Sequence, residues 1–145
     1  MNGTALPWLP HGPEFRFVDE VLEYSSGKSV VGCLDLGANS PRLPYAGTLP
    51  AFYLLESMIQ TCGLLCAEPE TDSDVPPLAV VVALDKVRWI RAPVEREKII
   101  TRGSLKHRIG LFLLCQCSAH SEDGTLLASG EVTLRIGHDR SPEQE

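Results

Sequence analysis

The sequence predicts an α+β domain in which an antiparallel sheet wraps around one long helix. Two observations support this fold class: a single long helical pattern lies in the first half of the chain, and the apolar segments after it have the pattern of strands. A helix and antiparallel strands that share one core form an α+β arrangement. With 145 residues, the chain has the usual length of one domain.

The elements before the helix are short. Residues 15–22 form an apolar segment with polar interruptions, which is consistent with a helical turn that runs into a strand. Residues 25–28 predict a turn, and Ser29–Leu36 is rich in Val and Leu and predicts a strand. Residues 37–48 contain Gly, Asn, Ser and two prolines, so we expect a loop before the helix.

The helical pattern covers residues 50–67. Thr48 is a suitable N-cap, and Pro50 suits the first turn. A helix of this length would extend for about 27 Å, the width of a small domain. Because it is apolar on nearly all sides, we expect it to be buried. An acidic surface loop is expected at residues 68–77.

Four strands are predicted in the second half of the chain. They are expected at residues 78–91, 97–107, 111–119 and 126–136. Gly110 and the Glu122-Asp123-Gly124 triplet are typical of hairpin turns between them. We therefore expect one domain at residues 1–137 and a polar tail at residues 138–145.

Composition and charge exclude several classes of protein. With 43% hydrophobic and 22% charged residues, the chain is globular rather than disordered or fibrous. Its net charge of -6 disfavours a nucleic-acid partner. There is no signal peptide and no apolar stretch of membrane-spanning length, so we expect no membrane span and a cytoplasmic location. The five cysteines show no C-x-x-C spacing, so we expect buried thiols and no metal site.

Glu56 is the most informative residue of the helix, because a carboxylate in an apolar helix is costly to bury without a partner. Gln60 lies four residues later and therefore on the same face. One interpretation is structural: the two side chains bond to backbone groups of a neighbouring strand. The other is functional, since buried carboxylates with a shifted pKa cluster at functional sites.

Three segments resemble the 3-hydroxyacyl-acyl-carrier-protein dehydratases, and together they span about residues 6–136. The opening Leu9-Pro10-His11, with Phe15 and Val18-Asp19, looks like the start of that family. The helix is similar to the family's Met-Pro-Gly … Glu-Ala-x-x-Gln, and residues 83–94 resemble its Ile-Asp-x-x-Arg-Phe … Pro-Val. The resemblance implies a single hot-dog domain, which is a long central helix wrapped by an antiparallel sheet.

In this family a histidine removes the C2 proton of a 3-hydroxyacyl thioester, and a carboxylate from the other subunit of a dimer helps the hydroxyl to leave. A backbone N–H at the start of the helix holds the thioester carbonyl, where the helix dipole favours negative charge. The resemblance thus implies an acyl carrier protein as partner and no cofactor beyond the carrier's phosphopantetheine arm.

The site residues carry over unevenly. Glu56 matches the catalytic acid, and Gln60 matches the glutamine that follows it. Pro50 matches the family's proline, and Ala51 stands where the family has glycine. The catalytic histidine aligns with Arg42, and an arginine cannot accept a proton. Such a loss of a general base costs about 10²–10⁴ in rate.

The departure at Arg42 leaves three interpretations. In the first, the chain is a dehydratase subunit, inactive alone, that donates Glu56 to a histidine-bearing partner. Subunits of polyene-forming type II synthases, including the aryl polyene kind, resemble it in having a similar Leu-Pro-Ala … Glu-x-Met-x-Gln helix. In the second, the chain is a non-catalytic module that binds an acyl chain or carrier. In the third, it is a hot-dog thioesterase with Glu56 as base. Both a homodimer and a heterodimer remain open.

A docking site for an acidic carrier would need a local basic patch, because the chain itself is acidic. The candidates lie close together in the sequence: Arg88, Arg91, Arg96 and Lys98. The alternative is an ordinary solvated charge cluster at strand ends.

Overall fold

The computed structural model describes residues 17–36, 51–66, 78–92 and 97–137. Several residues named above lie outside these ranges: Leu9, Pro10, His11, Phe15, Arg42, Thr48, Pro50 and Arg96. The loops predicted at residues 37–48 and 68–77 and the polar tail lie outside them too.

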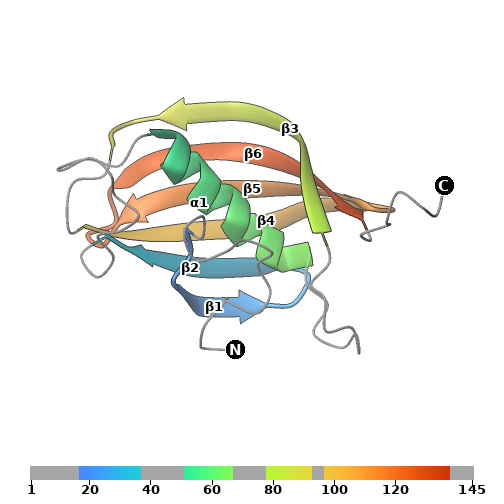
Figure 1. Cartoon of the computed structure of the whole chain (residues 1–145), viewed down its shortest axis with the longest axis horizontal. Coiled ribbons are helices and arrows are strands. Elements are labelled where there is room, and N and C mark those ends of the chain that lie inside the picture. The colour runs from blue at the N-terminus through green and yellow to red at the C-terminus, as the bar shows by residue number, and fades with distance from the viewer. Residues whose placement is uncertain (1–16, 37–50, 67–77, 93–96, 138–145) are drawn as a thin grey trace, which may run out of the picture.

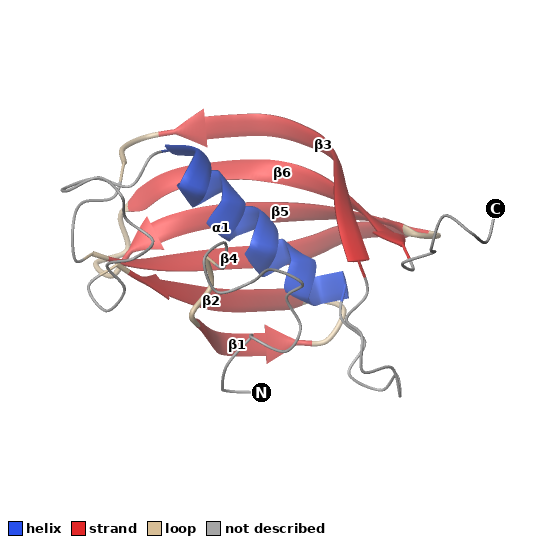
Figure 2. Cartoon of the chain, viewed as in Figure 1, coloured by secondary structure: helices blue, strands red, loops and turns tan. Residues whose placement is uncertain are grey.

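Six antiparallel strands form one sheet in the order β1-β2-β4-β5-β6-β3 (Figures 1 and 2). They are β1 (Glu20–Ser25), β2 (Ser29–Asp35), β3 (Leu78–Trp89), β4 (Lys98–Ile109), β5 (Phe112–Ser121) and β6 (Leu126–Gly137). The predicted strand at residues 29–36 and the four later strands are therefore confirmed to within two or three residues. The two edges of the sheet are the short β1 and the long β3.

The hairpin turns form where the glycines predict them. Gly27, Gly110 and Gly124 have φ values of 69°, 58° and 89°, which is the left-handed region that favours glycine. Gly110 connects β4 to β5, and Gly124 lies in the turn between β5 and β6.

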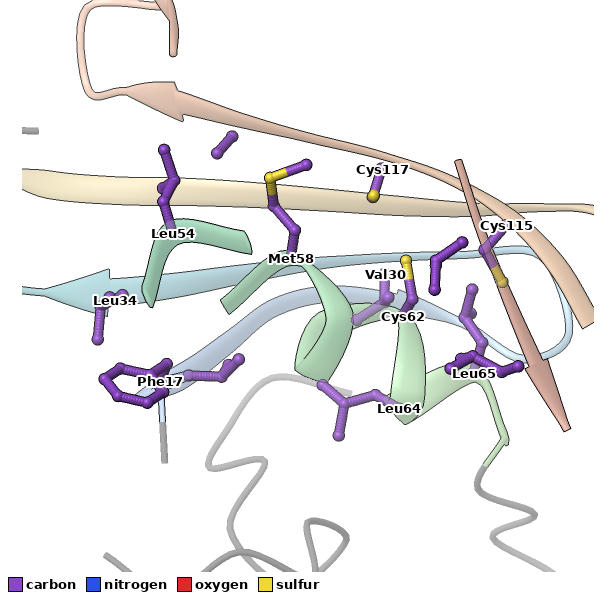
Figure 3. Close-up of a cluster of buried hydrophobic side chains, with 14 of the residues drawn as sticks. Phe17, Val30, Leu34, Leu54, Met58, Cys62, Leu64, Leu65, Cys115 and Cys117 are labelled. Atoms are coloured by element: carbon purple, nitrogen blue, oxygen red, sulfur yellow. The ribbon is translucent and has the colours of Figure 1, made fainter. Parts of the chain in front are cut away.

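The central helix crosses one face of the sheet (Figure 2). It consists of α1 (Ala51–Gly63) and a 3₁₀ turn, η4 (Leu64–Cys66), which together nearly match the predicted residues 50–67. Leu54, Met58 and Cys62 follow one another at four-residue spacing and are fully buried against the sheet (Figure 3). The expectation that the helix is buried on all sides is wrong. The sheet covers only one face of it, and Phe52 is 62% exposed.

Two glycines let the helix approach the β2 and β4 side of the sheet closely. A Cβ at Gly103 of β4 would lie 3.0 Å from the Cys62 Sγ atom, and a Cβ at Gly32 of β2 would lie 3.3 Å from the Thr61 Oγ1 atom. Both distances are tighter than ordinary packing. The helix therefore approaches β2 and β4 closely at these two glycines.

All five cysteines are buried free thiols, which confirms their predicted place in the core. Figure 3 shows Cys62 of the helix near Cys115 and Cys117 of β5. Hydrogen bonds with these two thiols, together with burial, raise the pKa of Cys62. Desolvation raises the pKa of Cys66 to about 12. Among the described residues, no cluster of His, Cys, Asp and Glu could hold a metal ion, and no helix is long and apolar enough to cross a membrane.

Candidate functional site

The candidate site centres on Glu56, in the second turn of α1. Its side chain is half-buried, whereas its neighbour Ser57 is fully buried. The four-residue spacing places Gln60 beside it, and the Gln60 Nε2 atom donates a hydrogen bond to the Glu56 Oε1 atom at 3.1 Å. The carboxylate is therefore held by a neutral donor of the same helix.

Gln60 is itself fixed by a distant part of the chain. It is 2% exposed, and its Oε1 atom accepts a hydrogen bond of 2.8 Å from the backbone N–H of Phe17. Because the amide oxygen faces this N–H, the amide NH₂ group must face Glu56. The orientation of the acid is thus set by a segment 43 residues earlier in the sequence.

A second bond holds the same segment in place. The Ser57 hydroxyl donates to the backbone carbonyl of Phe17 at 2.7 Å, so both backbone groups of Phe17 are bonded to the helix. The bond of Gln60 to the backbone before β1 supports the structural interpretation for that residue, and Glu56 is bonded to Gln60. Ser57 was not predicted; a lone serine between Glu56 and Met58 in an apolar helix was the only signal for it.

Ala51 is the first residue of α1 and is exposed. Its N–H is one of the four that have no partner within a helix, and it lies at the positive end of the helix dipole. Glu56 is about 7.5 Å farther along the helix axis. Ala51 and Glu56 therefore both lie within the first two turns of α1.

The outer face of the helix is apolar around Glu56. Phe52 is exposed and Ile59 is half-buried, and they lie four and three positions from Glu56 on the same side; the adjacent Leu55 is also half-buried. The described part of the chain therefore leaves an apolar surface with one carboxylate in its middle.

Strand β3 continues this uncovered surface. Val81 and Leu84 pair with the buried residues Leu134 and Val132 of β6, so they point toward the helix side of the sheet. They are nevertheless 38% and 41% exposed. Trp89, which pairs with the buried Ala128, is 46% exposed. Residues that face a core are normally covered, so this side is incomplete in the isolated chain.

Neither described histidine can act with Glu56 in the same chain. The His120 Nε2 atom shares a hydrogen bond of 2.9 Å with the Ser118 hydroxyl. Along β5 these two residues alternate with the buried Cys117 and Ala119. They therefore point away from the helix. His107 pairs with Leu114, which also lies on that outer face. The described residues thus contain no substitute for the histidine that is missing at position 42.

Three of the predicted docking residues lie near the start of the helix. Arg88 is the second-last residue of β3, Lys98 is the first residue of β4, and Arg91 lies between these strands in the sequence. The end of β3 and the start of β4 lie near the start of α1 (Figure 1). Arg91 bonds to both carboxylate oxygens of Glu97, at 2.9 and 3.2 Å, so its charge is partly offset. All three are exposed.

No protein-family model matches the chain. It is 26% identical over 140 residues to the 3-hydroxyacyl-[acyl-carrier-protein] dehydratase FabZ of Rhizobium rhizogenes, covering 94% of this chain and 87% of that protein. It is 29% identical over 133 residues to the FabZ of Streptococcus sanguinis, covering 89% and 92%.

Solved structures show the same fold. The dehydratase heterocomplex ApeI:P from Xenorhabdus doucetiae superposes with a TM-score of 0.78 at 18% identity, covering 95% of this chain and 93% of that one. A hypothetical thioesterase with coenzyme A from Streptococcus pneumoniae superposes with a TM-score of 0.63 at 16% identity, covering 83% and 87%. The chain is therefore a single hot-dog domain with a FabZ-like sequence, which confirms the predicted fold class.

Proposed function

We propose that the chain is a subunit of a 3-hydroxyacyl-acyl-carrier-protein dehydratase that is inactive alone and contributes Glu56 to a site shared with a histidine-bearing hot-dog partner. The observation that carries this proposal is the Glu56 carboxylate, held by Gln60 on the outer face of the central helix. The FabZ-like sequence supports the reaction class. The name of the ApeI:P heterocomplex supports the assembly of two different subunits.

The chemistry follows from the residues that each subunit has. The partner's histidine removes the C2 proton, and Glu56 in its acid form donates a proton to the C3 hydroxyl, which leaves as water. The Ala51 N–H stabilises the negative charge that develops on the thioester oxygen. In the second site of the dimer, Arg42 occupies the position of the base and cannot accept the proton.

The uncovered surface supports a partner at the β3 edge. Val81 and Leu84 face the helix side and are exposed, and Phe52 is exposed on the helix itself. A second hot-dog chain that extends the sheet at β3 would cover these side chains and would bring its own residues near Glu56. The N–H of Ala51 would then lie at the mouth of the shared site.

The carrier protein is proposed to dock at Arg88, Arg91, Arg96 and Lys98. Three of these residues lie near the start of the helix, the end at which the thioester would be held (Figure 1). Charge reversal at Arg91 and Arg96 should weaken the binding of an acidic carrier, and the matched control is charge reversal at Lys28 in the β1–β2 turn. Unchanged carrier affinity in the first variant would contradict this docking site.

The experiment is a dehydratase assay with 3-hydroxyacyl carrier protein as substrate. The chain alone, its histidine-bearing partner alone, and the mixture are compared. We expect activity in the mixture, and Glu56→Gln should lower it by about 10²–10⁴. Glu23→Gln, which makes the same chemical change on β1, is the matched control and should keep full rate.

Two results would contradict the proposal: equal activity with and without the partner, or full rate in the mixture that contains Glu56→Gln. Arg42→His provides a further check, because it would supply both groups from one chain and should give activity without a partner. Thioester hydrolysis by the isolated chain, lost in Glu56→Gln, would identify a thioesterase instead.

A non-catalytic acyl- or carrier-binding module is the second candidate. The bond from the Phe17 N–H to Gln60 favours it, because that bond explains a polar residue of the helix by structure alone. Such a module should still bind an acyl carrier after Glu56→Gln, and its mixtures should show no activity that depends on Glu56.

A further inference from the structure

The β4–β5 hairpin ends in an exposed apolar turn. Ile109, Leu111 and Phe112 are 76%, 48% and 44% exposed, and Gly110 makes the turn between them. The turn lies at the end of the sheet opposite the start of α1 (Figure 1). Three large apolar side chains at the tip of one hairpin are more than the scattered surface residues that need no explanation.

The hairpin tip, defined here as residues 106–112 with Arg135 of β6, is exposed on both faces. Every residue from Lys106 to Phe112 is exposed. Phe112 pairs with both Ile109 and Arg135, so these three lie on the outer face of the sheet. Arg108 pairs with the buried Leu113 and therefore lies on the helix side. Positively charged side chains therefore lie next to the apolar turn on both faces of the sheet.

The charge of this hairpin is opposite to that of the chain. Residues 98–121 contain four Lys or Arg residues and no Asp or Glu, in a chain with a net charge of -6. The Lys106 ammonium is 2.8 Å from the Glu131 carboxylate, so its charge is partly offset, while Arg135 adds a further exposed cation. An anionic surface is therefore the complementary partner.

We propose that the hairpin tip binds anionic phospholipid at a membrane surface, with its three apolar side chains inserted at the headgroup level and its cations on the lipid phosphates. An apolar tip with cations on both sides is suited to insertion into a layer that surrounds it. A folded acidic protein would contact only one face of the sheet, so the cation on the other face would take no part in binding. The proposed contact is peripheral, at the headgroup level.

This inference goes beyond the proposed function and does not depend on it. Strand β5 is separated from the β3 edge by β6, so a partner subunit at β3 leaves the tip uncovered. Glu56 takes no part in the contact.

The experiment is co-flotation of the full chain with vesicles of phosphatidylglycerol and phosphatidylcholine, or of phosphatidylcholine alone. We expect binding to the anionic vesicles only, with loss of binding at high salt. The double variant Ile109→Ser with Phe112→Ser should bind at least about tenfold more weakly. Arg135→Gln should bind about fivefold more weakly. Ile90→Ser removes a side chain of 50% exposure at the other end of the sheet and should bind normally.

Several results would overturn the proposal. These are no binding to anionic vesicles, equal binding to neutral vesicles, or normal binding by the double variant. Tip-dependent self-association without vesicle binding would identify a second copy as the occupant, and tip-dependent binding of an acidic carrier protein alone would identify a protein. The salt titration of the unmodified chain tests the proposal even if a variant fails to fold.

Discussion

The two edges of the sheet differ in length, charge and attachment to the helix. Strand β1 has six residues, two of which are exposed glutamates, and the segment before it is bonded to α1 through both backbone groups of Phe17. Strand β3 has twelve residues and a run of exposed apolar side chains from Val80 to Leu84. Short, charged edges resist pairing with another chain, whereas long apolar edges favour it.

Two glycines bring the helix close to two neighbouring strands of the sheet. Gly32 of β2 and Gly103 of β4 let α1 approach these strands closely, whereas the helix-facing Val81 and Leu84 of β3 remain exposed. Glu56 lies on the outer face of the helix, bonded to the neutral Gln60. The difference between the edges favours β3 over β1 as the edge at which the proposed partner would pair.

The largest effect is expected at the β3 edge. Val81→Lys with Leu84→Lys places two charges on the helix-facing side, where a partner would bury them at a large desolvation cost. The dissociation constant of the proposed dimer should rise at least about a hundredfold. Light scattering over a concentration series measures this. Glu23→Lys on β1 is the control and should leave the dimer intact; equal dissociation in both variants would remove the distinction between the edges.

A smaller effect is expected where the β1 side is attached to the helix. Gln60→Leu leaves the buried Phe17 N–H without its acceptor and should lower the free energy of unfolding by up to about 3 kcal/mol. Denaturant unfolding measures this value. Tyr24→Phe removes a long, 3.5 Å bond to the Leu64 carbonyl and should cost less. If Gln60→Leu were as stable as the unmodified chain, the bond to Phe17 would not hold this side.

Substitution of Gly103 tests how tightly the helix packs against β4. Gly103→Ala places a methyl group 3.0 Å from the Cys62 Sγ atom and should cost an amount at the low end of about 1–3 kcal/mol, because one side chain must shift. Gly63→Ala has no atom within 4 Å and should be neutral or slightly stabilising in the helix. Thermal unfolding of both variants measures the difference, and equal melting temperatures would mean that the approach is not tight.

The smallest effect is expected in the β5–β6 turn, which belongs to neither edge. Hydrogen bonds from the Ser121 hydroxyl and from Thr125 lower the pKa of Asp123 to about 2. A lowered pKa stabilises the folded state above the ordinary Asp pKa, and this contribution is lost as the pH falls through about 2. Between pH 5 and pH 2 the melting temperature of Asp123→Asn should therefore fall less than that of the unmodified chain. A variant with the same acid sensitivity as the unmodified chain would contradict the role of this turn.

The order of the elements from β2 onward and the shared face of Glu56 and Gln60 were predictable from the sequence. Strand periodicity, the turn glycines and the single helical stretch are local signals, so β2, the helix and the four later strands followed from them nearly to their bounds, whereas the bounds of β1 did not. Four-residue spacing on a helix is likewise local, and it predicted that the two polar side chains share a face; the hydrogen bond between them came from the structure. The sequence alone also shows that residue 42 is an arginine and not a histidine.

Only the tertiary structure decided how that pair is oriented and which surfaces stay open. The amide of Gln60 is turned by the Phe17 N–H, a contact across 43 residues that no local pattern encodes. Valines and leucines look alike in a sequence whether they are covered or not. The exposure of β3 and of the hairpin tip depends on strand order and on where the helix settles, and both arise from long-range packing.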